Sequence, residues 1–228
     1  MRILPFFLLL ACLPTPGRAA ERHFAVSGFE KVRVEGPFRV EIIVGVPPMA
    51  TASGSPQGLD RLSLEVQGRT LVIRPAQVAS DPAGGARGMV TVQIGTHDLS
   101  SAMLNGSGMM TIRGVRGLSF LLNVAGSGMG EVNGEVDQLR VAVVGSGSAR
   151  LSGHAARLEA RIKGSGGLDA AALVTKDQVV GTEGPVTVTI NASNSVALSA
   201  NGPATIIVSG GAACRISGAS SASVTGCR

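Results

Sequence analysis

The chain has 228 residues, enough for one large domain or two small ones, and 44% of them are hydrophobic. It contains 32 glycines and no Trp or Tyr, and only 15% of it is charged, which disfavours both disorder and a long coiled coil. The formal charge of +5 comes from scattered Lys and Arg without aromatic residues between them, so we expect no nucleic-acid partner.

Residues 1–19 have the parts of a secretory signal peptide. Arg2 precedes an apolar run that is too short to span a bilayer, and Gly17 and Ala19 fit the small-x-small pattern of a cleavage site. We therefore expect the mature chain to begin at Ala20 and the protein to be periplasmic or secreted. Removing this segment leaves 18 basic against 15 acidic side chains, a net charge of +3, so the basic character says little.

A second interpretation of the same segment remains open. The sequence Leu-Leu-Ala-Cys at 9–12 resembles a lipobox, which would make Cys12 the lipid anchor of an outer-membrane lipoprotein. No later stretch is long and apolar enough for a transmembrane segment, so we expect a mature chain that is soluble or tethered only at its start.

The next part of the chain, residues 20–104, is irregular but contains short alternating runs. Apolar and polar residues alternate at 62–66, 70–73 and 89–94, which predicts strands with one buried face. Residues 47–48 and 81–85 are rich in Pro and Gly and are predicted to be loops that leave the stack of strands.

From residue 105 the chain repeats every 18 to 20 residues. Gly-Ser-Gly occurs at 106–108, 126–128, 145–147 and 164–166, followed by weaker copies with Glu-Gly-Pro at 183–185 and Asn-Gly-Pro at 201–203. A mostly apolar residue follows four positions after the last glycine of each copy. These residues are Ile112, Val132, Leu151, Ala170, Val188 and Ile206, with a degenerate end at Val224.

Each repeat is predicted to be one coil of a β-solenoid. Two alternating strands per repeat cannot bury their apolar sides alone, so successive coils must stack about 4.8 Å apart. Glycine suits the corners because it adopts positive φ without a Cβ penalty. A second bend in each coil is marked by another set of glycines, Gly114, Gly134, Gly153, Gly218 and Gly226.

The stacking predicts a ladder of outward side chains of opposite charge. Its members stand three positions after the last glycine of each corner: Thr111, Glu131, Arg150, Asp169, Thr187 and Thr205. Cross-strand pairs of this kind stabilise a sheet by roughly 0.2–1 kcal/mol each.

We predict a single domain over residues 20–228, in which the irregular coils of 20–104 cap one end and the last turn of the regular repeats at 105–228 caps the other. Export would place Cys214 and Cys227 in an oxidising compartment, so we expect them to form a disulfide. Two buried free thiols are the alternative.

The sequence resembles the putative auto-transporter adhesin, head GIN domain, family of bacterial proteins. The resemblance covers residues 29 to about 209 and consists of the exported start, the opening segment at 29–42 with Glu-Gly-Pro, a strand pair near 64–73, and the repeated Gly-Ser-Gly. It implies a right-handed β-helix outside the cytoplasm. The family has no agreed catalytic residues, so it implies no site.

Two functions remain open for such a protein. The first is a non-catalytic adhesin-like or scaffold protein that contacts an unidentified macromolecule or the cell envelope. The alternative is a polysaccharide lyase or hydrolase built on a β-helix, which requires a cleft with two carboxylates from different turns. Glu131 and Asp169 would stand about 10 Å apart with Arg150 between them, which favours an ion-pair ladder over an acid/base pair.

Cofactor chemistry has little support in the sequence. His23, His97 and His154 are too widely spaced for a metal site, and neither a cofactor motif nor a nucleophile elbow is present, so we expect no catalytic, metal or cofactor residues. The serines of the four Gly-Ser-Gly copies are expected to cap turns through side-chain hydrogen bonds.

Overall fold

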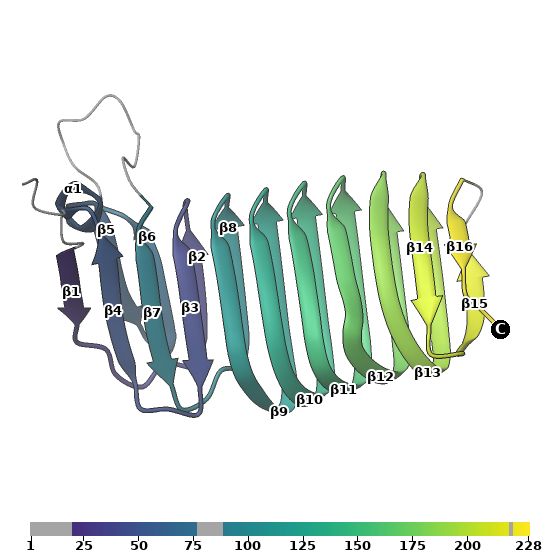
Figure 1. Cartoon of the computed structure of the whole chain (residues 1–228), viewed down its shortest axis with the longest axis horizontal. Coiled ribbons are helices and arrows are strands. Elements are labelled where there is room, and N and C mark those ends of the chain that lie inside the picture. The colour runs from purple at the N-terminus through teal and green to yellow at the C-terminus, as the bar shows by residue number, and fades with distance from the viewer. Residues whose placement is uncertain (1–19, 77–88, 219–220) are drawn as a thin grey trace, which may run out of the picture.

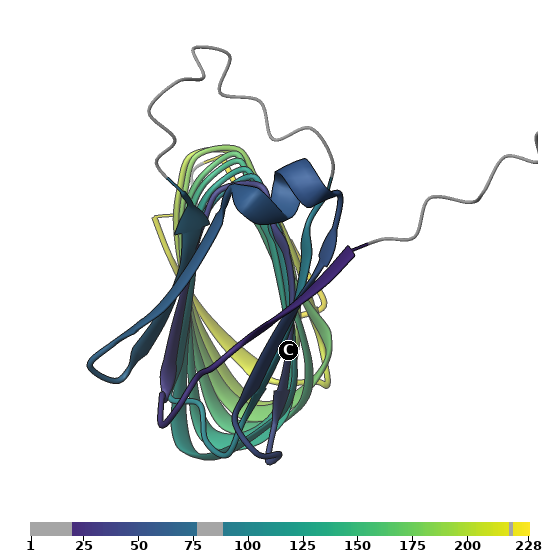
Figure 2. The ribbon, with the colours of Figure 1, turned by 90° about the vertical axis from the view of Figure 1, so that its left-hand side faces the viewer.

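The computed structural model describes residues 20–76, 89–218 and 221–228, which form a β-solenoid of about six turns (Figure 1). The predicted signal peptide at 1–19, with Cys12, and the predicted loop at 81–85 lie outside the described residues. Seen along its axis, the solenoid is a flattened tube with two broad sides (Figure 2). We call these sides face A and face B.

Five long strands run down face A, round a lower bend and up face B. They are β9 (Met109–Gly126), β10 (Met129–Gly145), β11 (Ser148–Gly164), β12 (Gly167–Glu183) and β13 (Val186–Asn201). All neighbours among them pair in parallel, as stacking of successive coils requires. The repeat from residue 105 therefore forms the regular middle of the solenoid.

Shorter strands complete the two faces at both ends. Face A has the order β1 (Ala20–Phe24), β4 (Met49–Gly54), β7 (Thr91–Thr96), β3 (Arg39–Val44), then β9 to β13, then β14 (Ala204–Ser209) and β16 (Ser223–Thr225). Face B has the order β5 (Leu62–Gln67), β6 (Thr70–Pro75), β2 (Lys31–Glu35), β8 (Ser101–Gly106), then β9 to β13, then β15 (Ala213–Ser217). The strands predicted at 62–66, 70–73 and 89–94 correspond to β5, β6 and β7.

The core is made of straight interior columns. Val132 pairs with Ile112 on one side and with Leu151 on the other, and all three side chains are buried. The stacked interior predicted from the repeat is therefore confirmed. One connected hydrophobic cluster extends from Phe29 to Ala212, because each coil contributes inward side chains to the same columns.

The corners between face B and face A depend on the first glycine of each Gly-Ser-Gly. Gly145 has φ of +111°, and a Cβ there would lie 2.5 Å from the carbonyl oxygen of Gly126 in the preceding coil. The backbone N–H of Ser146 donates to this same oxygen. Glycine is therefore required both by the backbone conformation and by the close approach of successive coils.

The predicted alignment of the later turns is wrong by two residues. Gly184, with φ of +104°, stacks on Gly164, the first glycine of the preceding triplet, and Val186 fills the inward position that Gly166 holds there. Pro185, and not Glu183, therefore takes the place of the serine in Gly-Ser-Gly. Proline has no N–H to donate, so this corner lacks the bond that the N–H of Ser146 makes to the preceding coil.

The same shift changes the later members of the columns. Asp169 pairs with Thr189 and not with Thr187, which instead pairs with Thr205. Val188 likewise stacks on Leu168 rather than on Ala170.

The second bend is confirmed only in part. Gly114 and Gly153 have positive φ at the lower bend, and Gly134 pairs with Gly153 on one side and with Val115 on the other. Gly218 instead lies over Ala200 near the end of β13 on face B, and Gly226 lies over Val208 near the end of β14.

The two ends of the solenoid are closed differently. At the N-terminal end, β1 and β4 pair antiparallel, β5 and β6 form an antiparallel hairpin, and helix α1 (Pro56–Asp60) buries Leu59 against the core. The side chain of Ser55 caps α1 by accepting from the N–H of Gly58. At the C-terminal end, β15 and β16 remain parallel, and the sulfurs of Cys214 and Cys227 lie 2.05 Å apart, at disulfide distance.

Candidate functional site

Face A carries the predicted charge ladder. Glu131, Arg150 and Asp169 stand in register on consecutive coils. The Nη1 atom of Arg150 lies 3.2 Å from Oε1 of Glu131, and its Nε lies 3.4 Å from Oδ2 of Asp169. The two acids share one guanidinium, so this part of the ladder is confirmed as an ion-pair network.

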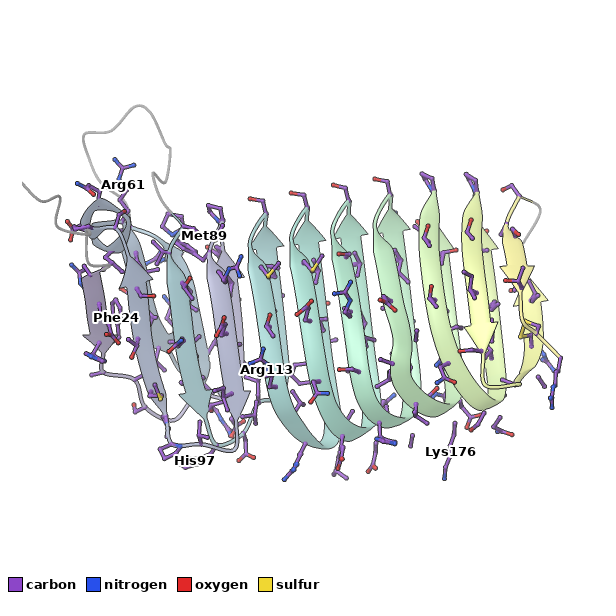
Figure 3. All side chains as sticks on the ribbon, in the orientation of Figure 1. Phe24, Arg61, Met89, His97, Arg113 and Lys176 are labelled. Carbon is purple, nitrogen blue, oxygen red and sulfur yellow. A yellow bond between two sulfur atoms is a disulfide. The ribbon has the colours of Figure 1, made fainter. Side chains whose placement is uncertain are left out.

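A second polar row runs beside the ladder. Arg113, Asn133 and Ser152 pair in register, and the Nδ2 group of Asn133 donates to Oγ of Ser152 at 3.0 Å. The two rows border a shallow hollow of about 350 Å³ that includes Thr111. Figure 3 labels Arg113 on this side of the molecule, whereas Lys176 projects from the lower bend. Face A thus presents donors and acceptors in straight lines.

Face B has a larger hollow, which we call the axial groove. It has a volume of about 560 Å³ and extends over β10, β11, β12, β13 and β15. Its floor carries the small residues Gly181, Ser199 and Ser217 on three successive coils, whereas Arg161 occupies the same row on the coil before them, and valines flank the row. The outward residues are Ala142, Val144, Glu159, Arg161, Lys163, Val179, Gly181, Glu183, Ala197, Ser199, Asn201, Arg215 and Ser217.

The axial groove contains two carboxylates from different coils, the feature that the enzyme alternative requires. Glu159 is 2.9 Å from Arg161, and Glu183 is 3.0 Å from Lys163. Val179 pairs with Glu159 in register, and Glu183 lies four residues farther along the same strand, so the backbone separates the two acids by about 13 Å. Hydrolysis needs carboxyl groups about 5–9.5 Å apart, which this spacing does not favour.

The serines of the corners form an exposed ridge. Within the described residues, the hydroxyls of Ser107, Ser127, Ser146 and Ser165 make no side-chain hydrogen bond, so the expected capping by these hydroxyls is wrong. The corners are instead held by backbone N–H groups that donate to glycine carbonyls of the preceding coil.

The three histidines lie in different parts of the fold. Nδ1 of His23 in β1 is 3.1 Å from Oγ1 of Thr51, His97 follows β7, and His154 lies in β11. Within the described ranges, no three His, Cys, Asp or Glu side chains are grouped to hold a metal ion. None of the helices that the structure describes has the length and apolarity needed to cross a membrane.

One perturbed carboxyl group near the lower bend was not predicted. Asp177 accepts hydrogen bonds from the hydroxyl of Ser195 at 2.5 Å and from the amide of Asn194 at 2.7 Å. These bonds, together with the nearby charges of Arg157 and Lys176, hold the pKa of Asp177 below the usual value of an aspartate. They tie two coils together and leave this carboxylate a poor proton donor.

The axial groove was also missed from the sequence. The available signal was the run of small residues at the same outward position in consecutive repeats, from Gly181 to Ser199 to Ser217.

Comparison with known proteins identifies one family for most of the chain. The family described as "Putative auto-transporter adhesin, head GIN domain" matches residues 28–212. No curated protein sequence matches the chain.

Three solved structures with the same fold come from Bacteroides and Parabacteroides species. A protein described as a putative adhesin from Bacteroides fragilis has a TM-score of 0.75 at 19% identity, over 92% of this chain and 94% of that one. A protein from Parabacteroides distasonis described as a putative lipid binding protein has a TM-score of 0.68 at 18% identity, over 92% and 98%. A putative adhesin from Parabacteroides merdae has a TM-score of 0.62 at 14% identity, over 91% and 95%. At these identities, the likeness establishes the fold alone.

Proposed function

Because the chain belongs to the family described as "Putative auto-transporter adhesin, head GIN domain", we propose that it is an exported, non-catalytic protein that attaches to a partner outside the cytoplasm. The observation that carries this proposal is face A. Its two polar rows repeat hydrogen-bonding groups at the coil spacing, so a partner with a regular polar surface can be contacted at several points at once.

Export is supported by two features of different kinds. The apolar start with its small-x-small cleavage pattern is typical of a secretory signal, and the cysteine pair lies at disulfide distance, which suits an oxidising compartment. We propose a periplasmic or secreted protein whose residues 20–228 form one domain, since its core is continuous.

The non-catalytic role is supported by the state of the carboxylates. The acids of the face A ladder share Arg150, and both acids of the axial groove are ion-paired. Hydrogen bonds from Ser195 and Asn194 lower the pKa of Asp177. A general acid needs the opposite shift.

The proposal is tested by binding of the mature chain to isolated cell envelopes. Residues 20–228 are incubated with envelopes, and bound protein is measured after sedimentation. We expect saturable binding that falls at least about fivefold in a double variant, Arg113→Ala with Asn133→Ala. Lys176→Ala is the control, because it removes an equally exposed cation from the lower bend. Equal binding by all three proteins would refute the role of face A.

The enzyme alternative is tested separately on a panel of envelope polysaccharides. Release of new reducing ends or unsaturated products by the wild-type chain, abolished in Glu159→Gln with Glu183→Gln, would overturn the non-catalytic proposal. We expect no release by either protein.

A further inference from the structure

Gly181 is unlike the other glycines of the described strands. Its φ is outside the left-handed region, and a Cβ built there meets no atom within 4 Å. Every other strand glycine either has positive φ or stands close to a neighbouring atom. Glycine in a strand interior weakens the strand, and it often marks a place where a ligand approaches closely. Folding does not require this glycine, and its effect is to keep the axial groove open.

The shape of the axial groove suits a long, narrow, apolar ligand. It crosses five coils, a length of about 19 Å at the usual strand spacing. Ala142 and Ala197 keep the floor low, and Val144 and Val179 expose 51% and 36% of their surface beside it. The volume of about 560 Å³ lies within the range of small-molecule sites. Its lining contains no aromatic side chain, which disfavours a sugar.

The charges of the groove are balanced at one end only. Glu159 and Glu183 neutralise Arg161 and Lys163 on the N-terminal side. At the C-terminal end, Arg215 has no carboxylate partner among the described residues, and residues 184–228 contain no Asp or Glu. An uncompensated guanidinium beside an apolar floor is complementary to an anionic head group.

We propose that the axial groove binds one long-chain fatty acid, with its carboxylate at Arg215 and its acyl chain lying over Ser199 and Gly181 and then along the aliphatic stem of Arg161, which stands in register between Gly181 and Ala142. The site lies on the face opposite the polar rows and is independent of envelope attachment. Each methylene removed from water on the floor contributes to binding, and the guanidinium fixes the direction of the chain.

The test is binding of cis-parinaric acid, a fluorescent linear fatty acid, and its displacement by palmitate. The wild-type chain is expected to bind it with a micromolar Kd. Gly181→Leu fills the floor and should weaken binding at least about tenfold. Thr187→Leu adds the same side chain to face A and should leave binding unchanged. Unchanged binding by Gly181→Leu would overturn the proposal.

The role of Arg215 is tested with a matched pair of competitors. Arg215→Glu should weaken displacement by palmitate at least about fivefold, but leave displacement by hexadecanol, which has no charge, within about twofold. Equal loss for both competitors would place the head group elsewhere and refute the proposed orientation.

Two further measurements keep the test decisive. Melting curves identify variants that fail to fold, and if Gly181→Leu is one of them, Ala142→Leu fills the same groove and carries the same expectation. Binding to anionic vesicles without binding of monomeric parinarate would show a surface that recognises membranes, and would overturn the single-molecule site.

Discussion

Reversing the charge at the centre of the face A ladder tests the register of the solenoid. In Arg150→Glu, three acids would stand on consecutive coils. Because the side chain of Arg150 is 58% exposed, each of its two ion pairs is of the surface kind, worth about 0.2–1 kcal/mol. Two new like-charge contacts cost similar amounts, so the total loss is about 0.8–4 kcal/mol. For a chain of this size, this lowers the melting temperature by roughly 2–16 °C.

The matched control is Arg113→Glu, which makes the same change of net charge on the same face. Arg113 pairs in register with Ile43 and Asn133, which carry no charge, so we expect a shift smaller than about 2 °C. Melting followed by circular dichroism in low salt and in 1 M NaCl separates the two, because salt screens the repulsion in Arg150→Glu. Equal shifts for both variants, or a salt-independent loss, would show that Glu131, Arg150 and Asp169 are not stacked neighbours.

Three further predictions concern other parts of the fold. Gln178 is buried, and its Oε1 has no hydrogen-bond partner among the described residues. Its Nε2 donates to Oγ1 of Thr175 and to the carbonyl oxygen of Asn191. The hydroxyl of Thr175 also donates to that carbonyl oxygen, so the oxygen keeps a donor without Gln178. Gln178→Leu should therefore raise the free energy of unfolding by about 1 kcal/mol in urea denaturation, and a loss above 1 kcal/mol would contradict this account. The lowered pKa of Asp177 means that its contribution to stability is present above the unfolded pKa and is lost as pH falls through the folded pKa. NMR titration should give a higher midpoint in Ser195→Ala than in wild type, and an unchanged midpoint would exclude this hydrogen bond as the cause. Replacing both cysteines of the Cys214–Cys227 pair by Ser should cost about 3 kcal/mol and lower the melting temperature by roughly 6–12 °C, whereas thiol titration of denatured wild-type residues 20–228 should find no free thiol.

The regular part of the fold could be predicted because both its corners and its strands leave a clear pattern in the sequence. Successive coils approach so closely at Gly126 and Gly145 that only glycine fits, and the residues between them alternate with the period of a strand. The error began where Gly-Ser-Gly becomes Glu-Gly-Pro. The second glycine of the triplet takes an inward position that Val186 takes in the next coil, so aligning on that glycine displaced the corner of the later coils.

The N-terminal topology could not be derived from periodicity. Strand β7 inserts between β4 and β3, and β2 pairs with both β6 and β8, so neighbours in space are far apart in sequence. No repeat length encodes such an order, because each pairing depends on which edge is still open when the strand arrives.

Candidate sites were harder to predict than the core. The ladder around Arg150 was found because opposite charges recur at the repeat length. The axial groove depends on two absences. Gly181 has no side chain to fill the floor, and the cation Arg215 has no Asp or Glu near it in the sequence. Such features become visible only when the outward positions of several coils are aligned correctly.

The unequal closure of the two ends gives the molecule a mechanical direction. At the N-terminal end, antiparallel pairing and helix α1 connect strands that are far apart in sequence. Beyond β13, each strand pairs only with the strand of the preceding coil. Tension on the C-terminus should therefore peel the solenoid from that side, one coil at a time. A bond between Cys214 and Cys227 would keep the last loop closed during this process. The chain would therefore lengthen in steps, one coil at a time, while the hydrophobic core of the N-terminal coils stayed folded.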